Sequence, residues 1–348
     1  MGFIEYAALS YCWGADTQLQ TTLANIAAHK LGIAILDLPQ TIKDAIEIAK
    51  FVNLRYLWID SLCIIQDSPD DWTSNCANMQ QYYSNSTLTI VAGSATRCNQ
   101  GFLRPKSTWH SNGFYLPIRM PKGGLGAVKL KERIRTGEPI DTRAWTLQEQ
   151  LLPKRTLHFA THTVHWKCGR TQHGLRAGID MIIKSNKSGF EHRSLWQNLV
   201  TEYMLREMSN SDDCLPAISG LASWLARDHK ITCGSKRCHQ KHLEYAAGLW
   251  IRENILIDDF RPEIFDIVTQ LLWYSQGRSG CRPLRYRAPS WSWAAFEGPI
   301  SFPLLEVDEV SDRLEVSRTR ACVTACETHF ASADAPYGRV TGGYISLK

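Results

Sequence analysis

Apolar residues follow two different periods along the first hundred residues of the chain. Short runs that are apolar throughout alternate with segments whose apolar side chains recur three and four residues apart, the spacing of one helical face. Ser68-Pro69 supports the start of the second helix, because serine caps helices and proline fits their first turn. The predicted order is strand 6–12, helix 38–52, strand 56–65, helix 69–83 and strand 88–94. Strands and helices that alternate over short connections predict a parallel α/β sheet.

The pattern loses this regularity after residue 95. We predict irregular or β structure at 97–142, a helix at 141–153, a hairpin at 155–168, mostly helix at 192–275 and strand at 286–302. The glycine-rich stretch KGGLGA at 122–127 lacks the lysine and spacing of a phosphate loop and is predicted to be a turn. The predicted organisation is an α/β domain at 1–168 with a parallel-sheet core. An α+β region at 169–348 is expected to pack against it.

The segment RYLWIDSLCIIQDSPDDW carries polar side chains inside an apolar run. Asp60, Ser61 and Cys63 interrupt the predicted strand. Ligands of open parallel sheets bind beyond the carboxyl ends of the strands. The ends of the first two predicted strands therefore give four candidate ligand-binding residues, namely Trp13, Gly14, Gln66 and Asp67.

Composition narrows the class of protein. The net charge of +5 is spread along 348 residues without a dense Lys/Arg run, which argues against a nucleic-acid surface. Eleven scattered cysteines and the lack of a secretory leader predict free thiols in the cytoplasm. No apolar stretch approaches the roughly 18 residues that cross a bilayer, so we expect no membrane span.

Several long motifs, in order, resemble the fungal heterokaryon incompatibility (HET) domain. They are YAALSYCWG, LPQTIKDAIEIAKFVNLRYLWIDSLCIIQDSPDDW, MQQYYSNSTLTIVAGSA with GFLRP, and RAWTLQEQLLPKRTLHF, which together cover residues 6–168. Four later motifs are similar to the C-terminal region that often accompanies this domain. These are DCLPAISGLASWLA, YAAGLW, QLLWY and YRAPSWSWA.

The resemblance implies an effector of non-self recognition, which triggers growth arrest and cell death on meeting an incompatible partner. HET domains have been likened to TIR domains, so a TIR- or flavodoxin-like strand order is expected. Some TIR domains hydrolyse NAD, which makes NAD the candidate substrate. We expect no other cofactor. The resemblance also implies a protein partner or self-assembly.

Three side chains are candidates for catalysis. The carboxylate of Glu149 would stabilise oxocarbenium-like charge during N-glycosidic cleavage, or would instead pair with Arg143 or Arg155 and order its helix. Asp60, which as a buried carboxylate needs a partner, would anchor a ligand or clamp a loop. Cys63 would be a nucleophile if a histidine of the 155–168 hairpin lowered its pKa, and otherwise a small buried hydrophobe. Three further residues complete the predicted ligand site, namely Arg143, Trp145 and Gln148.

Two other hypotheses stay open. One is a stand-alone enzyme of secondary metabolism, a cyclase or hydrolase, that has kept the HET scaffold for small-molecule chemistry. The other is a non-catalytic binding or scaffold module. A zinc site at Cys233, Cys238, His239 and His242 is not expected, because the spacing fits no standard finger.

Overall fold

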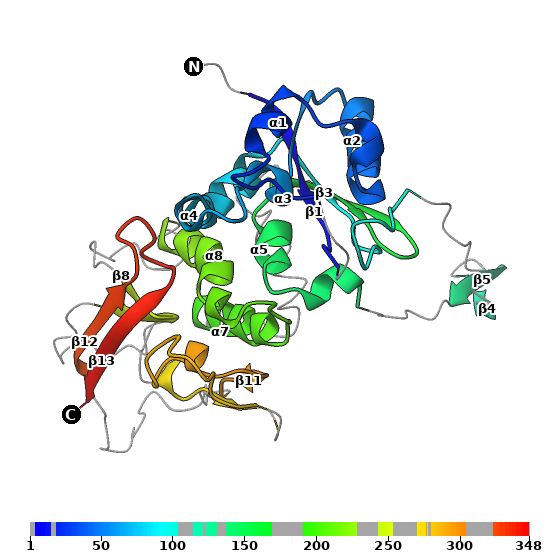
Figure 1. The fold of residues 1–348 in the computed structure, drawn as a ribbon. Helices are drawn as coiled ribbons and strands as arrows, with labels where there is room; N and C mark the ends of the chain where they lie inside the picture. Colours follow the sequence, from blue (N-terminus) through cyan, green and yellow to red (C-terminus); the bar gives the residue numbers. More distant parts are fainter. Residues whose placement is uncertain are drawn as a thin grey trace.

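The centre of the structure is a five-stranded sheet with the strand order β2-β1-β3-β6-β7 (Figure 1). The computed structural model describes residues 4–14, 19–103, 114–120, 123–130, 137–168, 191–227, 243–252, 270–275, 277, 280–303 and 323–347. The five strands are β1 (Tyr6–Ser10), β2 (Tyr56–Trp58), β3 (Leu88–Val91), β6 (Arg155–Phe159) and β7 (Val164–Cys168). The first four are parallel and β7 runs antiparallel to β6. Counted within this sheet alone the order is 2-1-3-4-5, which is flavodoxin-like. The predicted parallel α/β core is confirmed.

The alternation of side chains along β1 explains why helices cover both faces of the sheet. Ala7 and Leu9 belong to an apolar cluster with Ile42 of α2 (Gln40–Phe51). Ala8 points to the opposite face and belongs to a second cluster with α4 (Pro69–Asn85) and α5 (Thr146–Leu151). Successive side chains of a strand point to opposite faces, so Ser10 lies on the α5 side with Ala8. This places a polar residue of a buried strand under α5.

The second apolar cluster continues into the C-terminal half. Helices α7 (Glu191–Met204) and α8 (Pro216–Arg227) contribute to it, and α8 packs against both α4 and α5 (Figure 1). Trp196 and Trp293 each donate an indole N–H to the carbonyl of Gly248, with N···O distances of 2.9 Å. The core therefore spans both sides of the predicted boundary after Cys168, and that boundary stays a prediction.

The remaining elements are short. The helices are α1 (Ile26–Leu31) and α3 (Asp60–Cys63), and the 3-10 turns are η1 (Ile35–Asp37), η2 (Pro139–Thr142), η3 (Ser211–Asp213) and η4 (Trp293–Ala295). Four two-stranded pairs complete the list: β4 (Phe114–Arg119) with β5 (Leu125–Leu130), β8 (Leu243–Ala246) with β9 (Leu249–Arg252), β10 (Tyr274–Ser275) with β11 (Ile300–Ser301), and β12 (Val323–Phe330) with β13 (Val340–Leu347).

The predicted strand 56–65 is wrong beyond Trp58. The chain turns there into the short helix α3, and Asp60 lies at its start instead of inside a strand. The Asp60 carboxylate accepts a hydrogen bond from the backbone N–H of Ser61 at 2.7 Å. Short polar side chains that bind nearby N–H groups favour a helix start over a strand, and the Asp60 carboxylate is also held in place by the distant Trp13.

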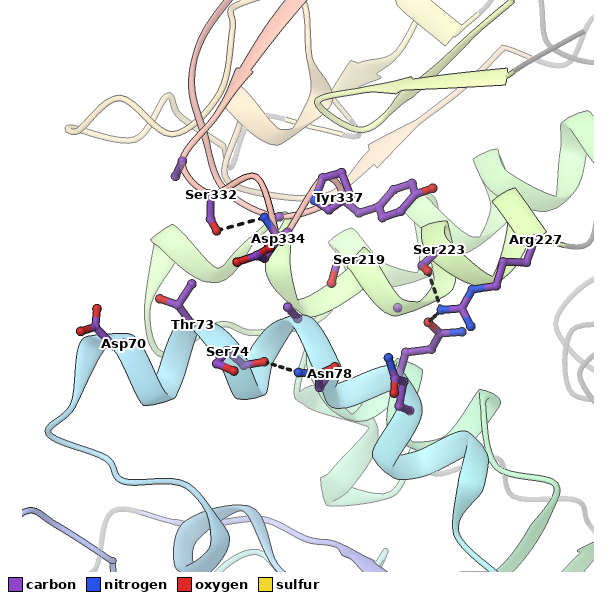
Figure 2. Close-up of a pocket in the computed structure, with 18 residues that line it drawn as sticks. Asp70, Thr73, Ser74, Asn78, Ser219, Ser223, Arg227, Ser332, Asp334 and Tyr337 are labelled. Carbon is purple, nitrogen blue, oxygen red and sulfur yellow. Dashed lines mark hydrogen bonds between the residues drawn. The ribbon is translucent and has the colours of Figure 1, made fainter. Parts of the chain in front are cut away.

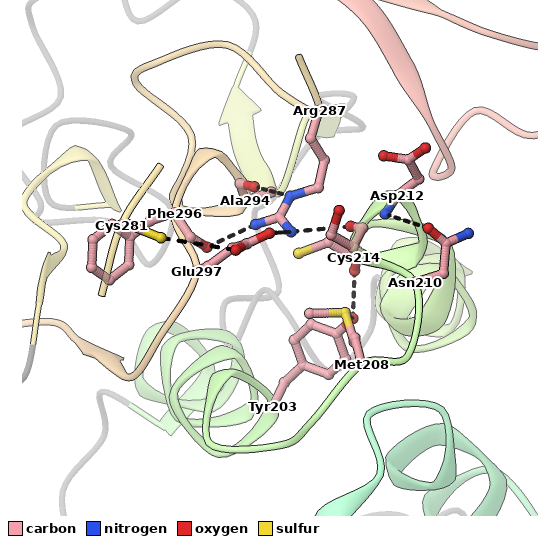
Figure 3. A network of polar contacts seen from close by, with 11 residues as sticks. Tyr203, Met208, Asn210, Asp212, Cys214, Cys281, Arg287, Ala294, Phe296 and Glu297 are labelled. Carbon is pink, nitrogen blue, oxygen red and sulfur yellow. Dashed lines mark hydrogen bonds and ion pairs between the residues drawn. The ribbon is translucent and has the colours of Figure 1, made fainter. Parts of the chain in front are cut away.

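Two further predictions concern the C-terminal half. The described part of the 192–275 segment is mostly helical, as predicted, but residues 243–252 form a hairpin in which Ala247 and Gly248 adopt positive φ angles of 44° and 96° in the tight turn between β8 and β9. The 286–302 segment is mostly not a strand. Arg287 lies near the start of this segment, and its guanidinium donates to the carbonyls of Ala294 and Phe296 at 2.6 and 2.8 Å (Figure 3). These carbonyls accept hydrogen bonds from a buried guanidinium instead of from a neighbouring strand.

Membrane-spanning helices and metal sites can be assessed only in the part of the chain that the structure describes. Within the described ranges, no helix has the length and apolar character needed to cross a bilayer. Those ranges also hold no group of three or more His, Cys, Asp or Glu side chains arranged to bind a metal ion. The Cys233–His242 motif lies outside the described residues.

Candidate functional site

A cavity of about 700 Å³ opens at the carboxyl ends of β1 and β3, where the strand order reverses. Its size falls within the range of ordinary small-molecule sites. Ligands bind at such switch points because the loops after the two strands separate there. The cavity walls come from five parts of the chain, namely the residues after β1, the segment from α3 into α4, Thr96 after β3, the segment from η2 into α5, and residues 207–213.

Seven of the ten residues predicted for a site line this one cavity. They are Trp13, Gly14, Asp60, Gln66, Arg143, Trp145 and Glu149. They come from separate segments, so their meeting is a finding of the structure. Their individual roles in binding or catalysis stay predictions.

Glu149 lies on the wall formed by α5 and is only 4% exposed. Its carboxylate accepts a hydrogen bond from the hydroxyl of Ser10 at 2.6 Å, which explains the polar residue on β1. Burial, followed by the nearby charge of Asp60, raises the pKa of Glu149 to about 7. The Arg143 charge and the Ser10 and Tyr83 hydroxyls act in the opposite direction. A carboxyl with a pKa near neutrality can both accept and release a proton under physiological conditions.

Asp60 faces the same cavity from the start of α3. One carboxylate oxygen accepts the indole N–H of Trp13 at 3.0 Å, which fixes the ring of Trp13 beside the cavity. Burial raises the pKa of Asp60, while the charge of Arg143 and the hydrogen bonds to its carboxylate lower it. Asp60 therefore clamps the loop after β1 and borders the ligand space at the same time.

Arg143 connects the two carboxyl groups electrostatically. Its guanidinium donates to the backbone carbonyl of Tyr11, just after β1, and its charge acts on both Asp60 and Glu149. The backbone carbonyl of Arg143 accepts a hydrogen bond from Arg206 at 3.3 Å. Arg206, which follows the end of α7, thus supports the turn that holds Arg143, although it lies far away in the sequence.

Two tryptophan rings that contact each other line the cavity. Trp72 of α4 and Trp145 meet edge to face, with ring centroids 6.4 Å apart and planes at 90°. The indole N–H of Trp145 donates to the carboxylate of Asp213 at 3.3 Å. Neither Trp72 nor Asp213 is among the site residues predicted from the sequence. A tryptophan in the first turn of α4, on the side of the helix that faces the sheet end, was the available signal for Trp72.

The lining of the cavity is acidic. Among its described residues are four carboxyl groups, those of Asp60, Glu149, Glu207 and Asp213, and the single guanidinium of Arg143, while Asp213 is also paired with Arg339. Indole faces and carboxylates together favour a positively charged ring or organic cation. The electrostatic character of the cavity therefore predicts the charge of its ligand.

The other three predicted residues lie outside the cavity. Cys63 is exposed and follows β2, with β1 and β3 between it and His158 on β6. Asp67 accepts the backbone N–H of Leu23 at 2.8 Å. Gln148 is fully buried, and its side-chain oxygen accepts the backbone N–H of Gly220 at 3.2 Å, which joins α5 to α8. Each of the last two has a structural contact that accounts for it.

A second cleft, of about 740 Å³, lies between α4, α8 and the turn at residues 331–338 (Figure 2). Hydroxyl and amide side chains line it, among them Thr73, Asn78 and Ser219. Several of these polar groups bind within their own helix: Thr73 donates to the carbonyl of Pro69 and Ser219 to that of Pro216, each at 2.8 Å. The cleft shows no convergence of ionisable groups comparable to that of the first cavity.

Comparison with known proteins agrees with the motif resemblance. Residues 6–149 match the family model described as Heterokaryon incompatibility protein (HET). Neither the curated proteins nor the solved structures yielded a match. The matched segment runs from the start of β1 to Glu149. It therefore contains the described cavity residues except those at 207–213. The match covers less than half of the chain, and residues 6–149 are therefore similar to a heterokaryon incompatibility (HET) domain.

Proposed function

We propose that the cavity hydrolyses the N-glycosidic bond between nicotinamide and ribose in NAD, and that the chain acts through this reaction as an effector of fungal non-self recognition. The observation that carries the proposal is the buried Glu149 carboxyl, with a pKa of about 7, beside Asp60, Arg143 and Trp145 in one cavity. A protein partner or self-assembly would then be the trigger, as the resemblance implies.

The chemistry uses Glu149 in its ionised form. The bond between C1′ of the ribose and the ring nitrogen breaks, and its electron pair leaves with nicotinamide, which becomes neutral. The ribosyl carbon gains oxocarbenium character, which a nearby carboxylate stabilises. Water attacks this carbon, and its proton passes to Glu149 and then to solvent. The products are nicotinamide, ADP-ribose and one proton.

The acidic and aromatic lining supports NAD over its reduced form. The nicotinamide ring of NAD carries a positive charge that suits indole faces and carboxylates, whereas the dihydronicotinamide ring of NADH is neutral. Asp60 and Trp13, joined by their hydrogen bond, offer one such pair of groups. We therefore expect NADH to compete weakly with NAD for the cavity.

The test is nicotinamide release from NAD by the purified chain, followed by liquid chromatography. Wild type is compared with Glu149→Gln and with Glu47→Gln, which makes the same change on the exposed side of α2, across the sheet from the cavity. General acid–base groups contribute about 10²–10⁴-fold to rate, so Glu149→Gln should lose at least about a hundredfold while Glu47→Gln keeps wild-type activity. Circular dichroism confirms that each variant is folded.

The alternatives separate in the same experiment. No release by folded wild type, even at concentrations that drive assembly, would refute NAD hydrolysis. Binding of nicotinamide mononucleotide without turnover, measured by calorimetry, would then support the non-catalytic binding module. The Ser10–Glu149 hydrogen bond is the observation that favours the binding module, because this bond orders α5 whether or not the carboxyl reacts.

A further inference from the structure

The last hairpin of the chain reaches the wall of the cavity. Strands β12 and β13 are joined by the turn at residues 331–338, which lies across α4 and α8 (Figure 2). Arg339 follows this turn directly and precedes the first residue of β13. It lies 190 positions beyond Glu149, the last residue of the family match. The contacts of its side chain are nevertheless with residues that line the cavity.

Arg339 joins a closed group of four side chains. Its guanidinium donates to one carboxylate oxygen of Asp213 at 3.0 Å and lies 4.7 Å from the ring centroid of Trp72. The other oxygen of Asp213 accepts the indole N–H of Trp145, and the two indoles meet edge to face. Asp213, Trp72 and Trp145 all line the cavity. Arg339 therefore contacts two members of one cavity wall and reaches the third through Asp213.

The guanidinium shape matters to this arrangement. A planar group can lie over an indole and bind a carboxylate at its edge, whereas a lysine ammonium is a compact point charge. The Arg339 side chain is 41% exposed and that of Asp213 is 13% exposed. Solvent therefore reaches the ion pair from the Arg339 side, while the Asp213 carboxylate is largely shielded. The buried Nε of Arg339 has no hydrogen-bond partner among the described residues, so the Asp213 pair and the Trp72 ring are what hold the group.

We propose that Arg339 is a positioning residue of the cavity, which holds Trp72 directly and Trp145 through Asp213, so that the C-terminal hairpin completes the ligand site of the HET-like domain. This inference rests on the proposed function only in taking the cavity as the ligand site. A merely structural role would attach the hairpin to the core without affecting the two indoles.

The experiment uses the full chain with 5-fluorotryptophan incorporated and ¹⁹F NMR as the first readout. Trp72→Phe and Trp145→Phe identify the two wall resonances among the tryptophans. Arg339→Met should shift or broaden both, and Arg339→Lys should do so to a smaller extent, while the other resonances keep their positions. The matched control is Arg227→Met, which removes an arginine of α8 that contacts Gln80 and Ser223 at the second cleft.

The second readout is the split between KM and kcat for NAD. Loss of an aromatic–cation contact and a partly exposed ion pair is expected to raise KM by about fivefold to tenfold in Arg339→Met, with kcat within about twofold of wild type. Arg227→Met should leave both constants unchanged. Asp213→Asn combined with Arg339→Met should show less than the product of the two single effects, because both changes remove the same pair.

The outcomes distinguish this inference from the proposed function. Unchanged wall resonances in folded Arg339→Met would overturn the positioning role, whatever the activity. Shifted resonances with an unchanged KM would also overturn it, because the wall would move without affecting the ligand. If wild type releases no nicotinamide, the proposed function fails. The NMR comparison, with added nicotinamide mononucleotide as the probe of the cavity, then decides the role of Arg339 alone.

Discussion

Glutamine in place of Glu149 isolates the cost of a buried ionisable group. The amide keeps the length of the side chain and an oxygen that can accept the Ser10 hydroxyl, but it cannot ionise. Burial, followed by the charge of Asp60, raises the Glu149 pKa from 4.5 to about 7. Between these two values the native state keeps a proton that the unfolded state has lost. Wild type must therefore lose stability as pH rises from about 4.5 through 7.

The magnitude follows from the size of the shift. A rise from 4.5 to about 7 corresponds to about 3 kcal/mol of unfolding free energy, at about 1.36 kcal/mol for each pKa unit. Since Glu149 is 4% exposed, solvent screening takes little from this figure. The loss should be half complete near pH 5.7 by the linkage relation and nearly complete by about pH 8. Glu149→Gln lacks this term, so its stability relative to wild type should increase by about 3 kcal/mol from pH 4.5 to 8.

Urea unfolding followed by tryptophan fluorescence at pH 5, 6, 7 and 8 measures this change. Other carboxyl groups titrate in the same range, and the difference between wild type and Glu149→Gln removes their common contribution. Glu47→Gln is the matched control and should follow the wild-type curve, because its side chain is exposed on α2. Parallel curves for wild type and Glu149→Gln across this range would refute the electrostatic account of the site.

Two more predictions concern the scaffold. Asp44 of α2 accepts the backbone N–H groups of Phe102 and Leu103 at 2.6 and 2.9 Å, so Asp44→Ala leaves one buried and one partly buried donor unpaired and should cost about 1–3 kcal/mol in urea unfolding. A normal unfolding midpoint would contradict this role. Arg287→Met removes the buried cation that binds the carbonyls around Trp293, and each buried carbonyl left unpaired costs about 1–3 kcal/mol. A thermal melt should show a lower midpoint, and unchanged melting would show that these carbonyls find other partners.

The sheet and its main helices could be predicted because their signals are local. The N-terminus of α4 depends on residues within one turn: Ser68 accepts the backbone N–H of Asp71 at 3.3 Å, and proline follows the cap. The α2 face depends on spacing within twelve residues. The hairpin of β6 and β7 was predicted from adjacent runs and is confirmed. Contacts at short sequence separation leave their pattern in the sequence itself.

The errors arose where distant residues decide the local structure. An apolar run such as 56–65 fits a strand or a buried helix equally well. The outcome depends on Asp60, whose carboxylate binds Ser61 beside it and Trp13 forty-seven positions away. The site shows the same limit. Glu149 and Asp60 could be proposed as polar anomalies in apolar surroundings, but their meeting with Arg143 depends on the register of the sheet.

The cavity also shows why the HET match alone does not describe the site. Helices α4 and α5, which carry Trp72 and Glu149, are packed against α8 from outside the matched segment, and α7 contributes to the same apolar cluster. Asp213 lies between α7 and α8 and binds Trp145, the residue that precedes α5. A chain limited to residues 6–149 would expose the apolar faces of both helices and leave the indole of Trp145 without its acceptor. The geometry of the candidate site therefore depends on the C-terminal region, and any reaction in the cavity belongs to the two parts together.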